Sequence, residues 1–104
     1  MLTFVELAPF AAVRDEYLDD EEFGELQEYL AEFPDAGDVI PGSGGCRKVR
    51  WSAKGRGKRG GIRVICFLRL AHGQVVLVTM YAKNVRDNVD PAILKQLKEA
   101  YQNG

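Results

Sequence analysis

Three strand-like segments follow one another in the second half of the chain, and their short connections leave few options for the fold. They span residues 46–52, 61–71 and 74–82, and the second of them is rich in Ile, Val, Phe and Leu. The last two are separated only by the tight-turn dipeptide His72-Gly73. The first two are joined by a short stretch of Gly, Lys and Arg at residues 53–60. Connections of this length predict strands that pair as antiparallel hairpins.

Helical patterns flank these strands. Residues 8–18 predict a first helix, and Asp19-Asp20 predicts the N-cap of a second one, which Pro34 ends. Its apolar residues recur at helical spacing and are Phe23, Leu26, Leu30 and Phe33. Asp90 followed by Pro91 predicts the cap and first residue of a last helix. The apolar stripe of that helix contains Ile93, Leu94, Leu97 and Tyr101.

The remaining segments complete the expected order of elements. A weak alternation at residues 2–7 predicts a short edge strand, and the Gly and Pro content of residues 37–45 predicts a loop. The expected order is β-α-α-β-β-β-α. We therefore expect one α+β domain over residues 1–104, with helices packed against an antiparallel sheet.

Charge is distributed very unevenly along the chain. Twelve of the first 38 residues are acidic and only Arg14 is basic, whereas Val39 to Arg86 contains eleven Lys or Arg and no Asp or Glu. The net charge of -1 hides this division. A charged strand face is usually solvated surface, but such a face normally mixes the two signs. The long acid-free segment favours a surface that binds a polyanion.

Strand alternation predicts where these cations lie, since successive side chains point to opposite faces. Lys48 and Arg50 share one face of their strand, while Val49 and Trp51 share the other and are expected in the core. We expect one face of the sheet to pack on the helices and the other to gather Lys48, Arg50, Arg63, Tyr81 and Lys83. The connecting loop would cover this face with Lys54, Arg56, Lys58 and Arg59.

Several functional classes are disfavoured. His72 is the only histidine and is expected in an exposed turn, and Cys46 and Cys66 lack metal-ligand spacing, so zinc sites and Cys/His nucleophilic chemistry are not expected. The sequence has no glycine-rich phosphate-binding loop between a strand and a helix. An enzyme that acts on a small phosphorylated metabolite is therefore a weaker alternative. No apolar run is long enough for a membrane span, and the start lacks a signal-peptide pattern. We expect a cytoplasmic protein with reduced cysteines and no small-molecule cofactor.

Four stretches together resemble a known family. They are DEYLDDEEF (15–23), GDVIPGSGGCRKVRW (37–51), GKRGGIRVI (57–65) and YAKN (81–84). They resemble the RelE/HigB superfamily of bacterial toxins, most closely the HigB-2-like branch, and the similarity covers nearly the whole chain. The resemblance implies the toxin of a type II toxin–antitoxin system with a RelE-like fold. It further implies a metal-independent, ribosome-dependent mRNA endonuclease that cuts in the A site and is silenced by a helix-turn-helix antitoxin.

The resemblance also implies particular site residues. By position, the family's basic pair on the first central strand falls on Lys48 and Arg50, and its strand arginine falls on Arg63. The residues expected to carry catalysis are Arg63, Lys48, Lys54, Lys83 and Tyr81. Those expected to contact RNA are Arg47, Arg50, Arg56, Lys58, Arg59 and Arg69. Arg63 is the best candidate for gripping the phosphate. Which lysine transfers protons, and whether Tyr81 stacks on a base, stay open.

Two further questions stay open. A non-catalytic RNA-binding or ribosome-binding module would use the same cationic face, and charge does not separate it from a nuclease. The antitoxin has two candidate surfaces, namely this face and the outer side of the acidic second helix, with Glu21, Glu25, Glu28 and Glu32. Because Arg63 is opposite the apolar side of its strand, we expect the fold to tolerate Arg63→Ala.

Overall fold

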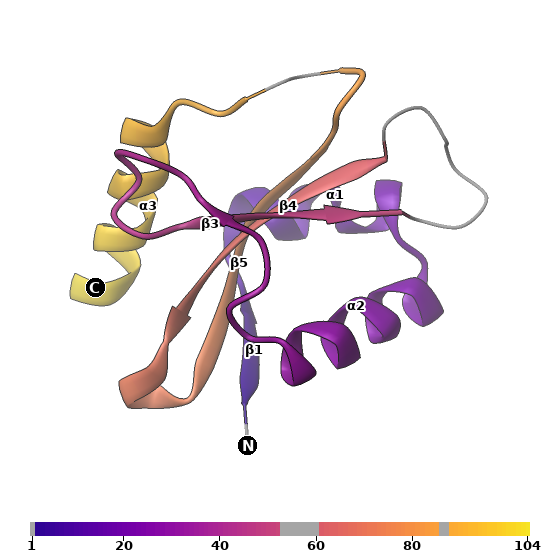
Figure 1. The fold of residues 1–104 in the computed structure, drawn as a ribbon, viewed down its shortest axis with the longest axis horizontal. Helices are drawn as coiled ribbons and strands as arrows, with labels where there is room; N and C mark the ends of the chain where they lie inside the picture. Colours follow the sequence, from indigo (N-terminus) through magenta and orange to yellow (C-terminus); the bar gives the residue numbers. More distant parts are fainter. Residues whose placement is uncertain (1, 53–60, 86–87) are drawn as a thin grey trace.

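The structure, a computed structural model, describes residues 2–52, 61–85 and 88–104 (Figure 1). Within them, the strands form one five-stranded sheet in the order β1-β5-β4-β3-β2. The strands are β1 (Thr3–Glu6), β2 (Asp38–Val39), β3 (Arg47–Trp51), β4 (Ile62–Arg69) and β5 (Gln74–Ala82). The helices are α1 (Ala8–Tyr17), α2 (Asp20–Glu32) and α3 (Pro91–Asn103), with one 3₁₀ turn at Leu70–His72. The predicted α+β fold and its order of elements are confirmed, with β2 as an addition.

The sheet is mixed, so the expectation of a purely antiparallel sheet is wrong at one edge. β1 pairs in parallel with β5, and the backbone N–H of Thr3 donates to the carbonyl of Gly73 at 2.8 Å. The other pairs are antiparallel. β1 and β5 are far apart in sequence, so no hairpin turn dictates their relative direction. The three predicted central strands nevertheless pair as expected.

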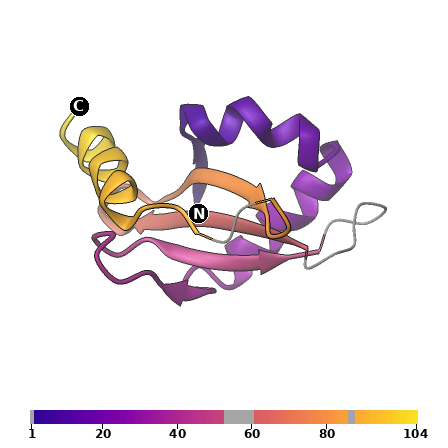
Figure 2. The ribbon, with the colours of Figure 1, turned by 90° about the horizontal axis from the view of Figure 1, so that it is seen from above.

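The two faces of the sheet have separate cores. Phe10 and Leu26, from α1 and α2, pack with Val64 and Leu77 on one face. Leu94 of α3 packs on the other face, with a group of buried side chains that includes Ile65, Phe67, Val76 and Val78. Figures 1 and 2 show α3 well separated from α1 and α2. The expectation that all helices share one face is therefore wrong for α3, because the apolar alternate residues of β4 and β5 also need cover.

The helix signals in the sequence correspond to real caps. In α2 the Glu22 N–H donates to Asp19 Oδ1 at 2.7 Å, and the Asp19 N–H donates to Glu22 Oε1 at 2.9 Å. This reciprocal pair is a capping box. In α3 the Ala92 N–H donates to the carboxylate of Asp90 at 2.9 Å, as predicted. Phe33 departs from the predicted buried stripe: it is the C-cap of α2 and is 47% exposed.

The glycine-rich segment between α2 and β3 is a braced hairpin turn rather than an irregular loop. The buried hydroxyl of Ser43 donates to the carbonyl of Ile40 at 2.6 Å and accepts from the Cys46 N–H at 3.0 Å. The ammonium of Lys98 in α3 donates to the carbonyl of Gly44. These bonds hold the β2–β3 hairpin against α3 and fix the edge of the sheet where the candidate site begins.

Gly37, at the start of this hairpin, should not tolerate a side chain. Its φ is +88°, and an added Cβ would lie 2.5 Å from the carbonyl oxygen of Lys48. We expect Gly37→Ala to cost about 2 to 3 kcal/mol, which lowers the melting temperature by about 10 °C or more. Gly24, inside α2, is the matched control because an added Cβ meets no atom within 4 Å there. Gly24→Ala should stabilise the protein by about 1 kcal/mol, measured by thermal and urea unfolding. Equal melting temperatures for the two variants would contradict this account of the hairpin.

Candidate nucleic-acid interface

Three candidate residues form a row across the three central strands. Arg63 of β4 is in register with Arg50 of β3 on one side and with Tyr81 of β5 on the other. Residues in register point to the same face of a sheet, and adjacent strands are about 4.8 Å apart. The row therefore places two guanidinium groups and a phenol side by side on the face that α3 partly covers.

The side chains of the row differ in exposure, since those on β4 and β5 are buried and the one on β3 is exposed. Arg50 is exposed, whereas Arg63 is 9% exposed and Tyr81 6% exposed. Arg63 Nη1 donates to the carbonyl of Ile62 at 3.4 Å, and Arg63 and Tyr81 each take part in further interactions within the protein. The expectation of a surface-exposed Arg63 is wrong, because β4 is a central strand with neighbours on both sides. Its guanidinium is consequently held in place before any ligand binds.

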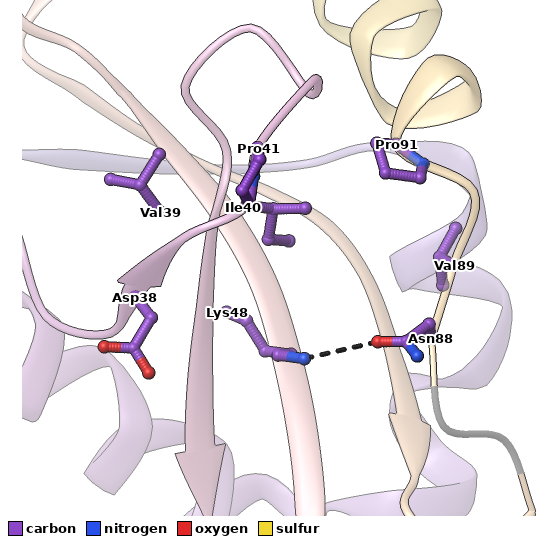
Figure 3. A pocket seen from close by; sticks show the side chains of 8 residues that line it. All are labelled: Asp38, Val39, Ile40, Pro41, Lys48, Asn88, Val89 and Pro91. Atoms are coloured by element: carbon purple, nitrogen blue, oxygen red, sulfur yellow. Dashed lines mark hydrogen bonds between the residues drawn. The ribbon is translucent and has the colours of Figure 1, made fainter.

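Lys48 lies on the same face as the row, two residues before Arg50. It is half-buried, and its Nζ donates to Asn88 Oδ1 at 3.5 Å (Figure 3). Beside it is a hollow of about 510 Å³ between the β2–β3 hairpin and the segment that leads into α3. Its lining residues are Asp38, Val39, Ile40, Pro41, Lys48, Asn88, Val89 and Pro91. Of these, only Lys48 was predicted as a site residue. The one signal for the hollow in the sequence is Asp38, which directly precedes the acid-free segment.

Lys83 lies at the other side of the row. It is exposed, follows β5, and its backbone N–H donates to the carbonyl of Gly61 at 3.2 Å. Because β3 and β5 run in the same direction, Lys48 precedes the row by two residues and Lys83 follows it by two. The predicted loop cations lie outside the described residues and are Lys54, Arg56, Lys58 and Arg59.

Two predicted RNA contacts are separated from the row. Arg47 alternates with Lys48 and so points to the opposite face, where its Nη1 donates to the carbonyl of Gly37 at 3.1 Å. Arg69 is six residues from Arg63, about 20 Å along the strand. Its Nη2 donates to the Gln102 carbonyl at 3.2 Å, and its guanidinium is 5.3 Å from the centre of the Tyr101 ring. A cation at this position interacts favourably with the negative C-terminal end of α3, so Arg69 stabilises the packing of α3 on the sheet.

The remaining reactive side chains have structural explanations. Cys46 and Cys66 are buried free thiols, as predicted, and burial raises the pKa of Cys66 to about 12, which disfavours the nucleophilic thiolate. His72 is exposed in the 3₁₀ turn. Trp51 packs on Tyr29 with 5.5 Å between ring centres, beside the core rather than on the cationic face. Among the residues described, no cluster of His, Cys, Asp and Glu could hold a metal ion.

The candidate row lies in a part of the chain that matches a known protein family. In the described parts of the chain, every helix is too short or too polar to traverse a lipid bilayer. The family described as the RelE toxin of the RelE / RelB toxin-antitoxin system matches residues 12–103. The match includes α2, α3, the row of Arg50, Arg63 and Tyr81, and both flanking lysines. With its α+β fold and its cationic row inside that match, the chain belongs to the RelE toxin family of toxin–antitoxin systems.

Proposed function

We propose that this toxin is a ribosome-dependent mRNA endonuclease of the HigB-2-like branch, which cuts mRNA in the ribosomal A site without a metal ion. The observation that carries the proposal is the row of Arg50, Arg63 and Tyr81, flanked by Lys48 and Lys83. All these cations come from the acid-free half of the chain. Membership of the RelE family supports a toxin that arrests translation by acting on mRNA.

The row suits phosphodiester cleavage by the neighbouring ribose. The 2′-oxygen attacks phosphorus, the bond from phosphorus to the 5′-oxygen breaks, and the products are a 2′,3′-cyclic phosphate and a 5′-hydroxyl. Negative charge grows on the phosphate oxygens in the transition state, and fixed donors there are usually the largest catalytic contribution. Arg63 fits this task because its planar guanidinium donates two parallel hydrogen bonds and is already held by burial.

The proton transfers need groups on both sides of the phosphate. Lys48 and Lys83 flank the row on opposite sides and are the described candidates for receiving the 2′-proton and protonating the 5′-oxygen. Tyr81, at 6% exposure, offers little ring surface for stacking on a base. We assign it to positioning Arg63, its register partner on β4.

The decisive experiment is cleavage of mRNA on programmed ribosomes by the purified toxin. We expect new 5′-hydroxyl ends inside A-site codons and a 2′,3′-cyclic or 3′-phosphate on the upstream fragment, with the same mRNA uncut when free in solution. The rival function is a non-catalytic module that binds ribosomes through the same face. Ribosome binding without new mRNA ends would support that rival.

Binding of RNA to the row should depend strongly on salt. If Arg50, Arg63 and Lys83 each contact one phosphate, three contacts predict a slope of about -2 for log affinity against log salt on single-stranded RNA. Affinity for a short ribo-oligonucleotide should then fall by about 20-fold between 50 and 200 mM KCl. Fluorescence anisotropy measures this directly. An affinity that is the same at both salt concentrations would exclude phosphate contacts as the basis of binding.

A toxin of this family requires a cognate antitoxin, and we propose that it is a helix-turn-helix protein that docks on α2. The outer side of α2 combines acidic residues with partly exposed aromatic rings. Tyr29 is 38% exposed and Phe33 47% exposed, and their ring centres are 5.2 Å apart. Glu28 and Glu32 are exposed beside them. We call Glu28, Tyr29, Glu32 and Phe33 the acidic–aromatic surface; its chemistry fits a basic segment with apolar side chains.

The position of these acids costs the helix stability. Glu32 is in the last turn of α2, which contains no basic residue, and a carboxylate is unfavourable at the negative end of a helix. A partner with basic side chains would offset that cost. α2 covers the opposite face of the sheet from the row, so docking there would inhibit by keeping the toxin off the ribosome rather than by covering Arg63.

A further inference from the structure

The hollow beside Lys48, lined on its two sides by the β2–β3 hairpin and the segment before α3, carries a more specific inference (Figure 3). We propose that it binds a guanine base of the mRNA, next to the phosphate that is cut. We call it the Asp38 pocket. The proposal rests on the proposed function and adds a sequence preference to it.

The shape and walls of the Asp38 pocket suit a nucleobase. Its volume of about 510 Å³ is within the range of small-ligand sites. Five of its eight lining residues are apolar: Val39, Ile40, Pro41, Val89 and Pro91. They come from two segments that face each other, with the face of the sheet between them. Such walls provide apolar contact for the two faces of a flat ring.

The polar groups of the pocket are divided between its sides. Asp38 and Lys48 are register partners on β2 and β3, yet the Lys48 ammonium extends away from Asp38 and donates to Asn88 Oδ1 at 3.5 Å. The Asp38 carboxylate makes no hydrogen bond or ion pair to any described residue. Asp90 differs, because its carboxylate caps α3. The pocket therefore presents an uncommitted acceptor on one side and donors on the other.

A carboxylate on a phosphate-binding face needs an explanation. It repels the phosphates of the RNA backbone and therefore weakens sequence-independent binding of RNA. It is a good acceptor for the N–H groups of bases, through which proteins read sequence. Asp38 is thus better suited to recognising a base than to binding the RNA backbone. The mRNA in an A site without tRNA has unpaired base edges that a protein can recognise.

Guanine is the base whose edge matches these groups. Its Watson–Crick edge has two adjacent donors, N1–H and the N2 amino group, and one acceptor, O6. The carboxylate of Asp38 accepts from both donors, while Asn88 Nδ2 donates to O6. Adenine, cytosine and uracil each offer only one donor position on this edge. Because Lys48 also flanks the catalytic row, the guanine belongs to a nucleotide adjoining the cleaved bond.

The test is a comparison of cleavage sites for the wild-type toxin and Asp38→Asn on ribosome-bound mRNA. Wild type should cut preferentially where guanine occupies one fixed position relative to the break, and inosine there should slow cleavage at least about tenfold, through loss of the N2 donor to a charged acceptor. Asp38→Asn should lose the guanine preference while it still cuts other codons. Asp35→Asn, an exposed acid outside the pocket, is the matched control and should keep the preference.

A binding measurement separates failure of the pocket from failure of the nuclease. Short ribo-oligonucleotides that contain guanine or inosine are titrated into wild type and Asp38→Asn. Wild type should prefer guanine at least about tenfold, and Asp38→Asn should bind both equally. Equal affinities in wild type, or a guanine preference that survives Asp38→Asn, would overturn the pocket even if cleavage occurs. Absence of cleavage together with a guanine preference would leave the pocket standing and refute the nuclease.

Discussion

Arg63→Lys should slow cleavage of ribosome-bound mRNA by about 100- to 1000-fold, the usual loss when one preorganised donor to a developing oxyanion is removed. The substitution keeps the positive charge, so long-range attraction of RNA is retained. It removes the planar fork that donates two parallel hydrogen bonds to a phosphate. The rate of the chemical step, followed in single-turnover cleavage on programmed ribosomes, should fall while affinity for the ribosome changes little.

Lysine is the first replacement to test because Arg63 is buried. Arg63→Ala would leave a cavity and unpaired partners in the centre of the sheet, so lost activity could reflect unfolding. The matched control is Arg69→Lys, on the same strand, where the guanidinium binds the C-terminal end of α3. Arg69→Lys should cleave at the wild-type rate. If Arg63→Lys stays within a few-fold of wild type and remains folded, another group stabilises the phosphate.

The row itself could be predicted from the sequence. β4 alternates buried apolar residues on the α1–α2 face with Arg63, Ile65 and Phe67 on the other. A one-residue slip would exchange these faces, so burial fixes the register strongly. Arg50 then falls beside Arg63 by the same rule, and Tyr81 pairs with Arg63 in the regular part of the β4–β5 ladder, beyond the register shift between Ile65 and Cys66.

The Asp38 pocket could not be predicted in this way. β2 has only two residues and both are exposed, so no alternation of buried and exposed residues in the sequence predicts this strand. Its pairing with β3 depends on a turn built around Ser43 and on the close approach of Gly37 to Lys48. The opposite wall, Asn88 to Pro91, is placed by the packing of α3 on Ile65 and Phe67, which joins segments far apart in sequence.

The burial of Arg63 and the exposure of Phe33 were also beyond the sequence pattern. Alternation predicts the face on which Arg63 lies but not how closely its neighbours surround it. Phe33 continues the spacing of Leu26 and Leu30, yet the helix ends one residue earlier and Phe33 adopts a non-helical φ of -125° and ψ of 73°. Its ring is 47% exposed, lies 5.2 Å from that of Tyr29 and is part of the acidic–aromatic surface.

The triple variant Glu28→Lys/Glu32→Lys/Phe33→Ala should weaken antitoxin binding by about 100-fold or more. Truncation of a central aromatic contact typically costs about 2 kcal/mol or more, and reversal of two charges opposite a basic partner slows association. Isothermal titration with the purified cognate antitoxin gives the affinity, and stopped-flow gives the association rate. Glu25 is left unchanged because it is only half exposed and already interacts within the protein.

Loss of binding in this variant would not reflect a damaged helix. Lysine is more favourable than glutamate in the last turn of α2, and Phe33 is already half exposed, so the variant should melt close to the wild type. Glu99→Lys, an exposed site on α3, controls for the change in net charge and should bind the antitoxin normally. Cleavage on ribosomes should persist in the triple variant, since α2 and the row lie on opposite faces of the sheet. Unchanged antitoxin affinity would move the docking site to the cationic face, where RNA and antitoxin would then exclude each other.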